Sequence, residues 1–178
     1  MNKFIAFLRG INVGGHRRIK MVELKKMFED LGFIKVQTYI QSGNVIFQTS
    51  GSGSRTLSEK IESAVSEQFG FTVPVIIRTC KEMKKILREN PFPNIKDFKQ
   101  LNVTLLSDKP KPEERKEMDK LDFGADKFVI KGKEVYISYE GKCYLSKLTN
   151  NLLEKKLKVS ATSRNWKTIN KMNEMCCE

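Results

Sequence analysis

Apolar and polar residues follow two different spacings in the first eighty residues. Four short runs have the length and composition of β-strands: residues 3–8, 35–40, 44–49 and 72–78. Apolar residues recur at helical spacing in residues 21–31 and 57–69, and a glycine follows each segment. The resulting order, β-α-β-β-α-β, predicts a ferredoxin-like α-β plait. Pro74 cannot donate a hydrogen bond to a neighbouring strand, so the fourth strand is predicted at a sheet edge, with the first and third strands in the centre.

The second half of the chain predicts a similar plan. It contains a helix pattern at 80–89, a strand at 101–106, a helix opening at Pro112 and a hairpin turning near Gly132. Two further helical patterns follow, and residues 158–163 between them are predicted to form a turn. We therefore expect an α+β protein with two ferredoxin-like (α-β plait) subdomains and a C-terminal pair of helices. The predicted domains are 1–79, a βαββαβ subdomain, and 80–178, an α+β subdomain that includes the terminal helical hairpin.

The chain is strongly basic. Its 178 residues include 33 Lys and Arg against 21 Asp and Glu, a formal net charge of +12. Residues 1–79 carry 11 basic and 6 acidic side chains, and residues 141–178 carry 8 and 3, so each end has a net charge of +5. A basic protein of this kind attracts polyanions or phosphorylated ligands. The alternative is a basic surface that is only solvated.

The remaining composition points to a cytoplasmic protein. No stretch approaches the roughly 20 apolar residues of a membrane span, so we expect no membrane partner. The opening residues lack the form of a signal peptide. The four cysteines, Cys80, Cys143, Cys176 and Cys177, show no metal-ligand spacing, and we expect four reduced thiols.

The stretch LRGINVGGHRRIK, residues 8–20, combines three glycines with several basic side chains. In a split β-α-β unit the first two strands are parallel, so this loop and the IQSGN hairpin are predicted at the same end of the sheet. Glycines allow backbone N–H groups to approach an anion, and the following helix directs its positive end to the same place. The alternative is a loop that needs glycines for its backbone conformation. The candidate anion-binding residues here are Arg9, Gly10, Asn12, Gly14, Gly15, Arg17, Lys20, Gln41, Ser42 and Asn44.

A second polar group lies near the C-terminus, in SKLTNN and TSRNWKT. Its candidate anion-binding residues are Lys147, Asn150, Arg164, Asn165 and Lys167. One interpretation is a helix-turn-helix whose second helix contacts nucleic acid. The interpretation we favour is a helical hairpin packed on the second sheet, with Trp166 in the core and Thr162 or Ser163 as a helix cap.

Several of these motifs together resemble a bacterial family, the domain-of-unknown-function family 1697. The motifs are FLRGINVGG, TYIQSGNVIF, VPVIIR, NPFP and SKLTNNLLEKKL, followed by ATSRNWKTI. The resemblance extends from Phe4 to about Met172. It implies two α-β plait subdomains, and it implies no activity.

No catalytic constellation is evident in the sequence. His16 is the single histidine, and its basic neighbours would favour a neutral imidazole that could act as a base. A solvated histidine is the simpler interpretation. The chain has no nucleophile elbow, no H-E-x-x-H motif and no paired acidic motif, and we expect no metal and no cofactor.

Three functions fit these observations. The first is nucleic-acid binding through a basic surface, with Tyr39 and Phe47 available for base stacking if they face outward. The second is an enzyme or sensor for a small phosphorylated metabolite or nucleotide at the glycine-rich loop. The third is a protein-interaction domain that uses the edge strand at 73–78. We expect binding rather than catalysis, with nucleic acid as the first candidate ligand.

Overall fold

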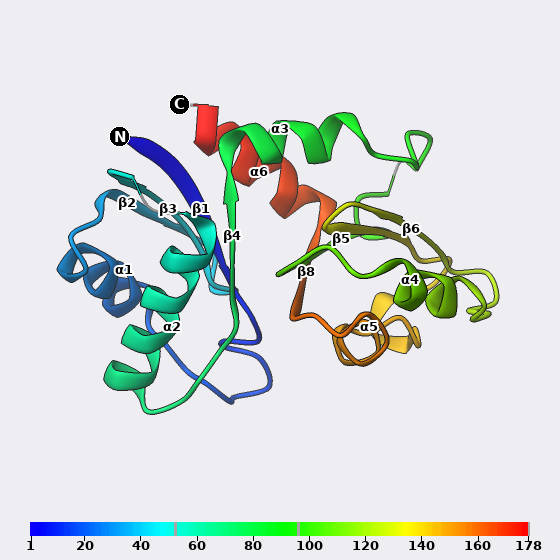
Figure 1. Ribbon diagram of the computed structural model, residues 1–178, viewed down its shortest axis with the longest axis horizontal. Helices are drawn as coiled ribbons and strands as arrows, with labels where there is room; N and C mark the ends of the chain where they lie inside the picture. The colour runs from blue at the N-terminus through cyan, green and yellow to red at the C-terminus, as the bar shows by residue number, and fades with distance from the viewer. Residues whose placement is uncertain (52, 96, 178) are drawn as a thin grey trace. The chain divides into compact units, whose positions relative to one another are not determined.

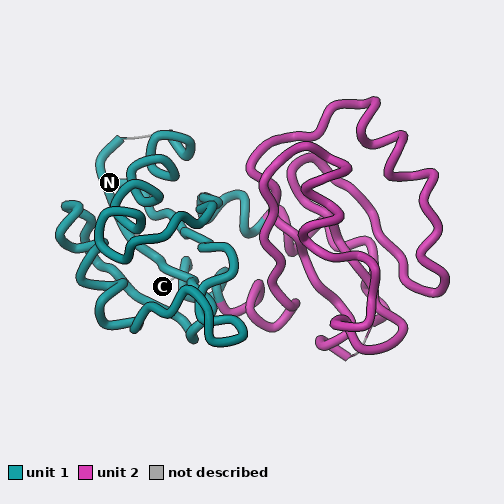
Figure 2. The backbone as a smooth tube through the Cα atoms, turned by 90° about the horizontal axis from the view of Figure 1, so that it is seen from below, with its two compact units in different colours: residues 1–84, 172–178 teal, residues 85–171 magenta. Residues whose placement is uncertain are grey.

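The protein consists of two compact units, each built around its own sheet (Figures 1 and 2). The computed structural model describes residues 1–51, 53–95 and 97–177. Unit 1 comprises residues 1–84 and 172–178, and unit 2 comprises residues 85–171. The chain thus passes from one unit to the other inside α3 (Cys80–Arg88) and returns inside α6 (Trp166–Cys177). The sequence boundary at 79/80 falls at the start of α3, whereas the end of α6 groups with the N-terminal unit.

The sheet of unit 1 has the strand order β2-β3-β1-β4. Its strands are β1 (Asn2–Leu8), β2 (Ile34–Tyr39), β3 (Asn44–Thr49) and β4 (Val75–Thr79), and every neighbouring pair is antiparallel. Helix α1 (Met21–Asp30) connects β1 to β2, and α2 (Ser54–Phe69) connects β3 to β4. This is the predicted plait, with the first and third strands central and β4, directly after Pro74, at an edge.

Aromatic side chains fill the core between this sheet and its two helices. The ring of Phe47 lies 4.5 Å from that of Phe33 and 5.4 Å from that of Phe28, centroid to centroid. The alternate positions of β1, Ile5 and Phe7, are fully buried as well, so the central strand is covered on both faces. Phe47 is therefore not available to stack on a base, and Tyr39 is half-buried.

Unit 2 repeats the plait. Its strands are β5 (Leu101–Leu106), β6 (Lys127–Lys131), β7 (Glu134–Ser138) and β8 (Ala161–Asn165), in the order β6-β7-β5-β8. Helix α4 (Pro112–Asp119) connects β5 to β6. A short 3₁₀ helix, η1 (Cys143–Leu145), and α5 (Asn150–Leu157) lie between β7 and β8. The prediction of two ferredoxin-like subdomains is confirmed.

The connection between the two terminal helices differs from the prediction. Both α5 and α6 are present, but residues Ala161–Asn165 form strand β8 instead of a turn. Ala161 pairs with Leu106 and Asn165 pairs with Asn102, which places β8 at an edge of the second sheet. The helix-turn-helix interpretation and the favoured helical hairpin are therefore both wrong, because a paired strand separates α5 from α6. The proposed cap at Thr162 or Ser163 is wrong for the same reason.

The expectation of four reduced thiols is also wrong. Cys80, the first residue of α3, forms a disulfide with Cys176 in the last turn of α6, and their Cα atoms are 5.6 Å apart. Both cysteines belong to unit 1. Cys143 and Cys177 are free and exposed. The bonded cysteines are 96 positions apart in the sequence, so local spacing does not reveal this pair.

Candidate functional site

The glycine-rich loop and the β2–β3 hairpin lie together, as the parallel arrangement of β1 and β2 predicts. Asn12 Nδ2 donates a hydrogen bond to the Gln41 carbonyl oxygen over 2.8 Å. The Leu8 amide, at the end of β1, donates to the Gly43 carbonyl oxygen over 2.8 Å. Two segments about thirty residues apart thus form one surface at the end of the first sheet.

The glycine-rich loop is a small hairpin of its own. Val13 and His16 form a bridge, and the His16 amide donates to the Val13 carbonyl over 3.0 Å. Gly14 and Gly15 between them have φ values of +58° and +79°, which suit glycine in a tight turn of this kind. These two glycines are therefore required by the turn itself, as the alternative interpretation expected.

Asn12 and Asn44 hold this surface together. Besides Gln41, the Asn12 side chain donates to the Ile19 carbonyl and accepts from the Ile19 amide, each over 2.9 Å. Asn44 is fully buried, and its Nδ2 donates to the Tyr39 carbonyl over 3.0 Å and to Ser42 Oγ over 2.9 Å. Their amide groups position the loop and the hairpin, which is a structural role.

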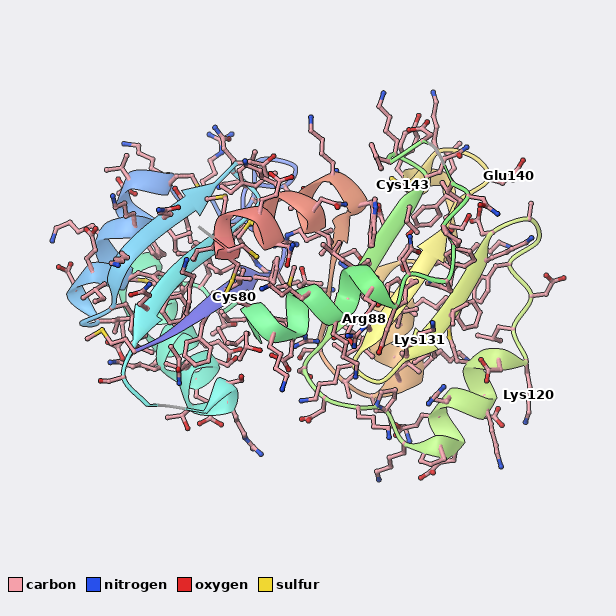
Figure 3. The ribbon with its side chains drawn as sticks, turned by 90° about the horizontal axis from the view of Figure 1, so that it is seen from above. Cys80, Arg88, Lys120, Lys131, Glu140 and Cys143 are labelled. Atoms are coloured by element: carbon pink, nitrogen blue, oxygen red, sulfur yellow. A yellow bond between two sulfur atoms is a disulfide. The ribbon has the colours of Figure 1, made fainter. Side chains whose placement is uncertain are left out.

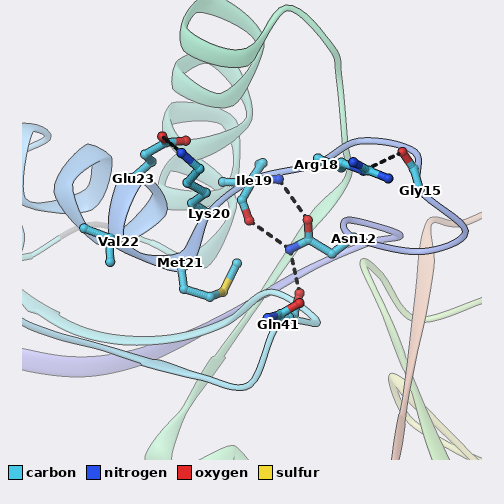
Figure 4. Close-up of a pocket in the computed structure, with 9 residues that line it drawn as sticks. All are labelled: Asn12, Gly15, Arg18, Ile19, Lys20, Met21, Val22, Glu23 and Gln41. Atoms are coloured by element: carbon cyan, nitrogen blue, oxygen red, sulfur yellow. Dashed lines mark hydrogen bonds and ion pairs between the residues drawn. The ribbon is translucent and has the colours of Figure 1, made fainter.

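A pocket of about 600 Å³ opens beside this surface (Figure 4). Its size falls within the roughly 300–1,000 Å³ typical of small-molecule sites. The lining residues are Asn12, Gly15, Arg18, Ile19, Lys20, Met21, Val22, Glu23 and Gln41. The pocket therefore joins the loop, the hairpin and the first turn of α1.

The first turn of α1 is open to this pocket. Leu24 makes the first intrahelical hydrogen bond, to the Lys20 carbonyl oxygen, so the three preceding N–H groups have no acceptor within the helix. Lys20 occupies the N-cap position and provides no side-chain cap. The N–H groups of residues 21–23 and the helix dipole together favour a negative charge at this point.

Three charged side chains determine the electrostatics of the pocket. Arg18 Nε donates to the Gly15 carbonyl oxygen over 3.1 Å, which holds the guanidinium against the loop. Lys20 Nζ lies 3.7 Å from a carboxylate oxygen of Glu23, and the Lys20 side chain is 84% exposed. Glu23 partly offsets the positive charge of the pocket, since an anion bound there would compete with it for Lys20.

The structure separates the predicted residues of this region into two groups. Asn12, Gly15, Lys20 and Gln41 line the pocket, and the structure adds Arg18, which the sequence analysis did not select. The remaining candidates lie outside the pocket lining: Arg9, Gly10, Gly14, Arg17, Ser42 and Asn44. Of the two adjacent arginines, Arg18 borders the pocket, and Arg17, with a φ of +49°, does not.

The second predicted group lies in unit 2, and most of its polar side chains have structural roles. Arg164 is buried, and its guanidinium donates to Thr162 Oγ1 over 2.8 Å and to the Ser163 carbonyl over 2.9 Å. Burial lowers the Arg164 pKa to about 10. Asn150 Oδ1 accepts a hydrogen bond from Ser163 Oγ over 2.7 Å.

The other members of this group differ in exposure. Asn165 Oδ1 accepts from the Thr168 amide over 2.8 Å and so caps α6, a role that the sequence analysis gave to Thr162 or Ser163. Lys147 and Lys167 are exposed. These two lysines are the members of the group whose charge faces solvent.

Metal-ligating side chains do not cluster among the described residues, and the single histidine lies at the surface. His16 is exposed, at the tip of the glycine-rich loop. No group of three or more potential metal-ligating side chains occurs in the part of the chain that the structure describes. No helix in that part is long and apolar enough to cross a membrane.

The chain is similar to one known protein family and to a solved structure. The profile of the family described as Protein of unknown function (DUF1697) matches residues 1–136. The chain belongs to the DUF1697 family. No curated protein matches it. Among solved structures, the conserved bacterial protein SP0830 from Streptococcus pneumoniae is similar, with a TM-score of 0.80, 21% sequence identity and 98% of each chain covered. At that identity the likeness establishes the fold of this DUF1697 protein, and no ligand.

Proposed function

We propose that this DUF1697 protein binds a phosphate-bearing small ligand, such as a nucleotide, in the pocket of unit 1. The observation on which the proposal depends is the uncapped first turn of α1, whose residues line a pocket of ligand size. Backbone N–H groups at a helix start are suited to phosphate oxygens because they donate several hydrogen bonds without a positive charge of their own.

The side chains around this turn support the same ligand class. Arg18 and Lys20 add two positive charges, and a guanidinium can donate two parallel hydrogen bonds to one phosphate. Val22 is 80% exposed and Met21 is half-buried, so the pocket also offers apolar surface. A phosphorylated molecule with an apolar or planar part fits this combination better than inorganic phosphate does.

Isothermal titration calorimetry with pyrophosphate and AMP tests the proposal. We expect saturable binding that Arg18→Gln weakens at least about fivefold, the effect of losing one charge-assisted hydrogen bond. Arg55→Gln is the matched control, because Arg55 is also an exposed arginine of unit 1, on α2, paired with Glu59 at 3.1 Å. Absence of binding, or equal effects of the two substitutions, would refute the proposal.

The second candidate function is nucleic-acid binding. It is favoured by the net charge of +12. Because Phe47 is buried in the core, this candidate depends on phosphate contacts rather than on stacking against the first sheet. Fluorescence anisotropy with labelled single-stranded RNA, single-stranded DNA and duplex DNA at increasing salt tests it. For single strands, log K is expected to fall with log salt with a slope of about −0.7 per contacted phosphate. Absence of binding at low salt excludes it.

A further inference from the structure

A second hollow, of about 700 Å³, lies in unit 2. It is bordered by the start of β5, by the segment after β7 that includes η1, and by Asn165 at the end of β8. Glu140 and Cys143, labelled in Figure 3, belong to its rim. Like the pocket of unit 1, it falls within the size range of small-ligand sites.

One exposed aromatic side chain lines this hollow, and a second lies beside the lining residues in sequence. Phe98 and Tyr144 are 54% and 73% exposed, and every other aromatic side chain in residues 1–51, 53–95 and 97–177 is buried or half-buried. Tyr144 lines the hollow, and Phe98 lies between Asp97 and Lys99, which both line it. Exposed rings beside a hollow are the surfaces on which proteins stack unpaired nucleobases.

Side-chain amides supply the polar part of the lining. Asn102 is paired with Asn165 across the β5–β8 ladder, and both residues line the hollow together with Gln100. Asn102 Oδ1 is buried and has no hydrogen-bond partner among the described residues, which costs free energy. Asn165 uses Oδ1 as the cap of α6, which leaves its Nδ2 as a donor. The two asparagines therefore place an unpaired acceptor just beneath the lining and a donor on it, and the edge of a nucleobase requires one of each.

The charges of the lining favour a neutral ligand. Lys99 and Lys142 are balanced by Asp97 and Glu140, in contrast to the basic pocket of unit 1. Lys142 Nζ lies over one face of the Tyr144 ring, 5.7 Å from its centre, and the Tyr144 side chain is 73% exposed. A phosphate group gains little binding free energy where positive and negative side chains balance. A neutral planar molecule is repelled by neither.

We propose that this hollow binds one unpaired nucleobase, stacked on Tyr144 and hydrogen-bonded by Asn102 and Asn165. The proposal does not depend on the phosphate pocket of unit 1. A base of a single-stranded nucleic acid and a free nucleoside share this chemistry, and the experiment separates them by comparing nucleosides with oligonucleotides.

The test uses adenosine, guanosine, cytidine and uridine, which carry no phosphate. Each is titrated into ¹⁵N-labelled protein while the side-chain amide signals of Asn102 and Asn165 are followed by NMR. We expect at least one nucleoside to shift these signals saturably. Tyr144→Ala should weaken the binding of that nucleoside about tenfold, the usual effect of losing one stacked base. Tyr144→Phe, which keeps the aromatic ring, should bind the nucleoside as the wild type does. Tighter binding of a short single-stranded oligonucleotide would identify the polymer as the source of the base.

Leu145→Ala is the matched control, because Leu145 is 75% exposed in the same 3₁₀ helix and does not line the hollow. Arg18→Gln should leave nucleoside binding unchanged, so failure here and failure of the phosphate proposal are distinguishable. No shift with any nucleoside, equal effects of Tyr144→Ala and Leu145→Ala, or equal shifts with a monosaccharide would overturn the proposal.

Discussion

Cys80 and Cys176 are bonded to each other at a sequence separation of 96, and the loop that they close contains every residue of unit 2. The two cysteines lie in the two helices through which the chain leaves and re-enters unit 1. Their bond therefore constrains the unfolded chain over more than half of its length.

The first prediction concerns this disulfide. In the chain-entropy treatment, a bond closing about 100 residues contributes about 4.7 kcal/mol, and measured values are often smaller. We expect Cys80→Ser to lower the free energy of unfolding by about 2–4 kcal/mol in urea denaturation. Cys143→Ser, at an exposed free thiol, is the control and should have little effect. The disulfide would be refuted if the native protein had four titratable thiols and if a reductant left its free energy of unfolding unchanged.

The second prediction concerns Asn12, whose side chain makes three hydrogen bonds within the site. Each such bond contributes about 0.5–1.5 kcal/mol, so Asn12→Ala should lower the free energy of unfolding by about 2–3 kcal/mol. Gln41 contributes only its backbone carbonyl to this network, so Gln41→Ala is a matched control. Equal denaturation midpoints for the two variants would show that the Asn12 side chain does not hold the loop.

The third prediction concerns two reasons why a position requires glycine: a positive φ angle, and too little space for a Cβ atom. Gly43 has a φ of +76°, and a Cβ placed on it would lie 2.8 Å from Leu8 Cβ. Gly32 has a similar φ, +84°, with open space around it. Gly32→Ala should cost about 1–2 kcal/mol for backbone conformation, and Gly43→Ala a further 1–3 kcal/mol, roughly, for overpacking. Thermal unfolding of both variants measures the difference, and similar melting temperatures would mean that the hairpin can relax away from Leu8.

The sheets and the meeting of the two loops could be predicted from the sequence because they follow from local patterns. Apolar spacing indicated six elements of unit 1, and their order placed β1 parallel to β2. Strand β8 could not be recognised in the same way, since ATSRN is short and polar and becomes a strand by pairing with β5. Tertiary pairing also explains why residues 161–163 of the predicted turn belong to a strand, whereas residues 158–160 connect α5 to it.

The roles of single side chains in the candidate site also depend on tertiary contacts that the local sequence does not reveal. Asn12 and Asn44 have the polarity of ligand-binding residues, but their partners are backbone groups that are distant in sequence. Arg18 was missed because nothing in the order of Arg17 and Arg18 shows which one borders the pocket. That depends on the positive φ angles of the loop, which only the folded chain displays.

The fourth prediction concerns Glu23, the acidic residue in the first turn of α1. Its carboxylate lies 3.7 Å from Lys20 Nζ and repels an anion at the helix start. Glu23→Gln should therefore tighten pyrophosphate binding about two- to fivefold in calorimetry at low salt. Glu29→Gln, in the last turn of the same helix, removes the same charge far from the pocket and should change the affinity little. Weaker binding by the Glu23 variant would place the anion elsewhere.

The fifth prediction concerns alkaline pH. Burial, followed by the nearby Cys143 and Asp126, raises the pKa of Tyr139 to about 12, and its hydroxyl donates to the Leu148 carbonyl over 3.3 Å. In the unfolded chain a tyrosine ionises near pH 10, roughly its reference value. Between about pH 10 and 12 the unfolded state therefore loses a proton that the folded state keeps, and the free energy of unfolding must fall as pH rises. Tyr139→Phe should lower stability at neutral pH by about 1 kcal/mol and reduce this alkaline slope.

The control for that measurement is Tyr144→Phe, which removes a phenol that is 73% exposed. Chemical denaturation at a series of pH values from 8 upward gives both slopes. Tyr136, whose hydroxyl donates to the Ile86 carbonyl over 2.9 Å, also has a raised pKa because of burial, so part of the slope should remain in the Tyr139 variant. Identical slopes for the wild type and Tyr139→Phe would mean that the Tyr139 hydroxyl ionises in the folded protein as readily as in the unfolded chain, against its buried position between β7 and η1.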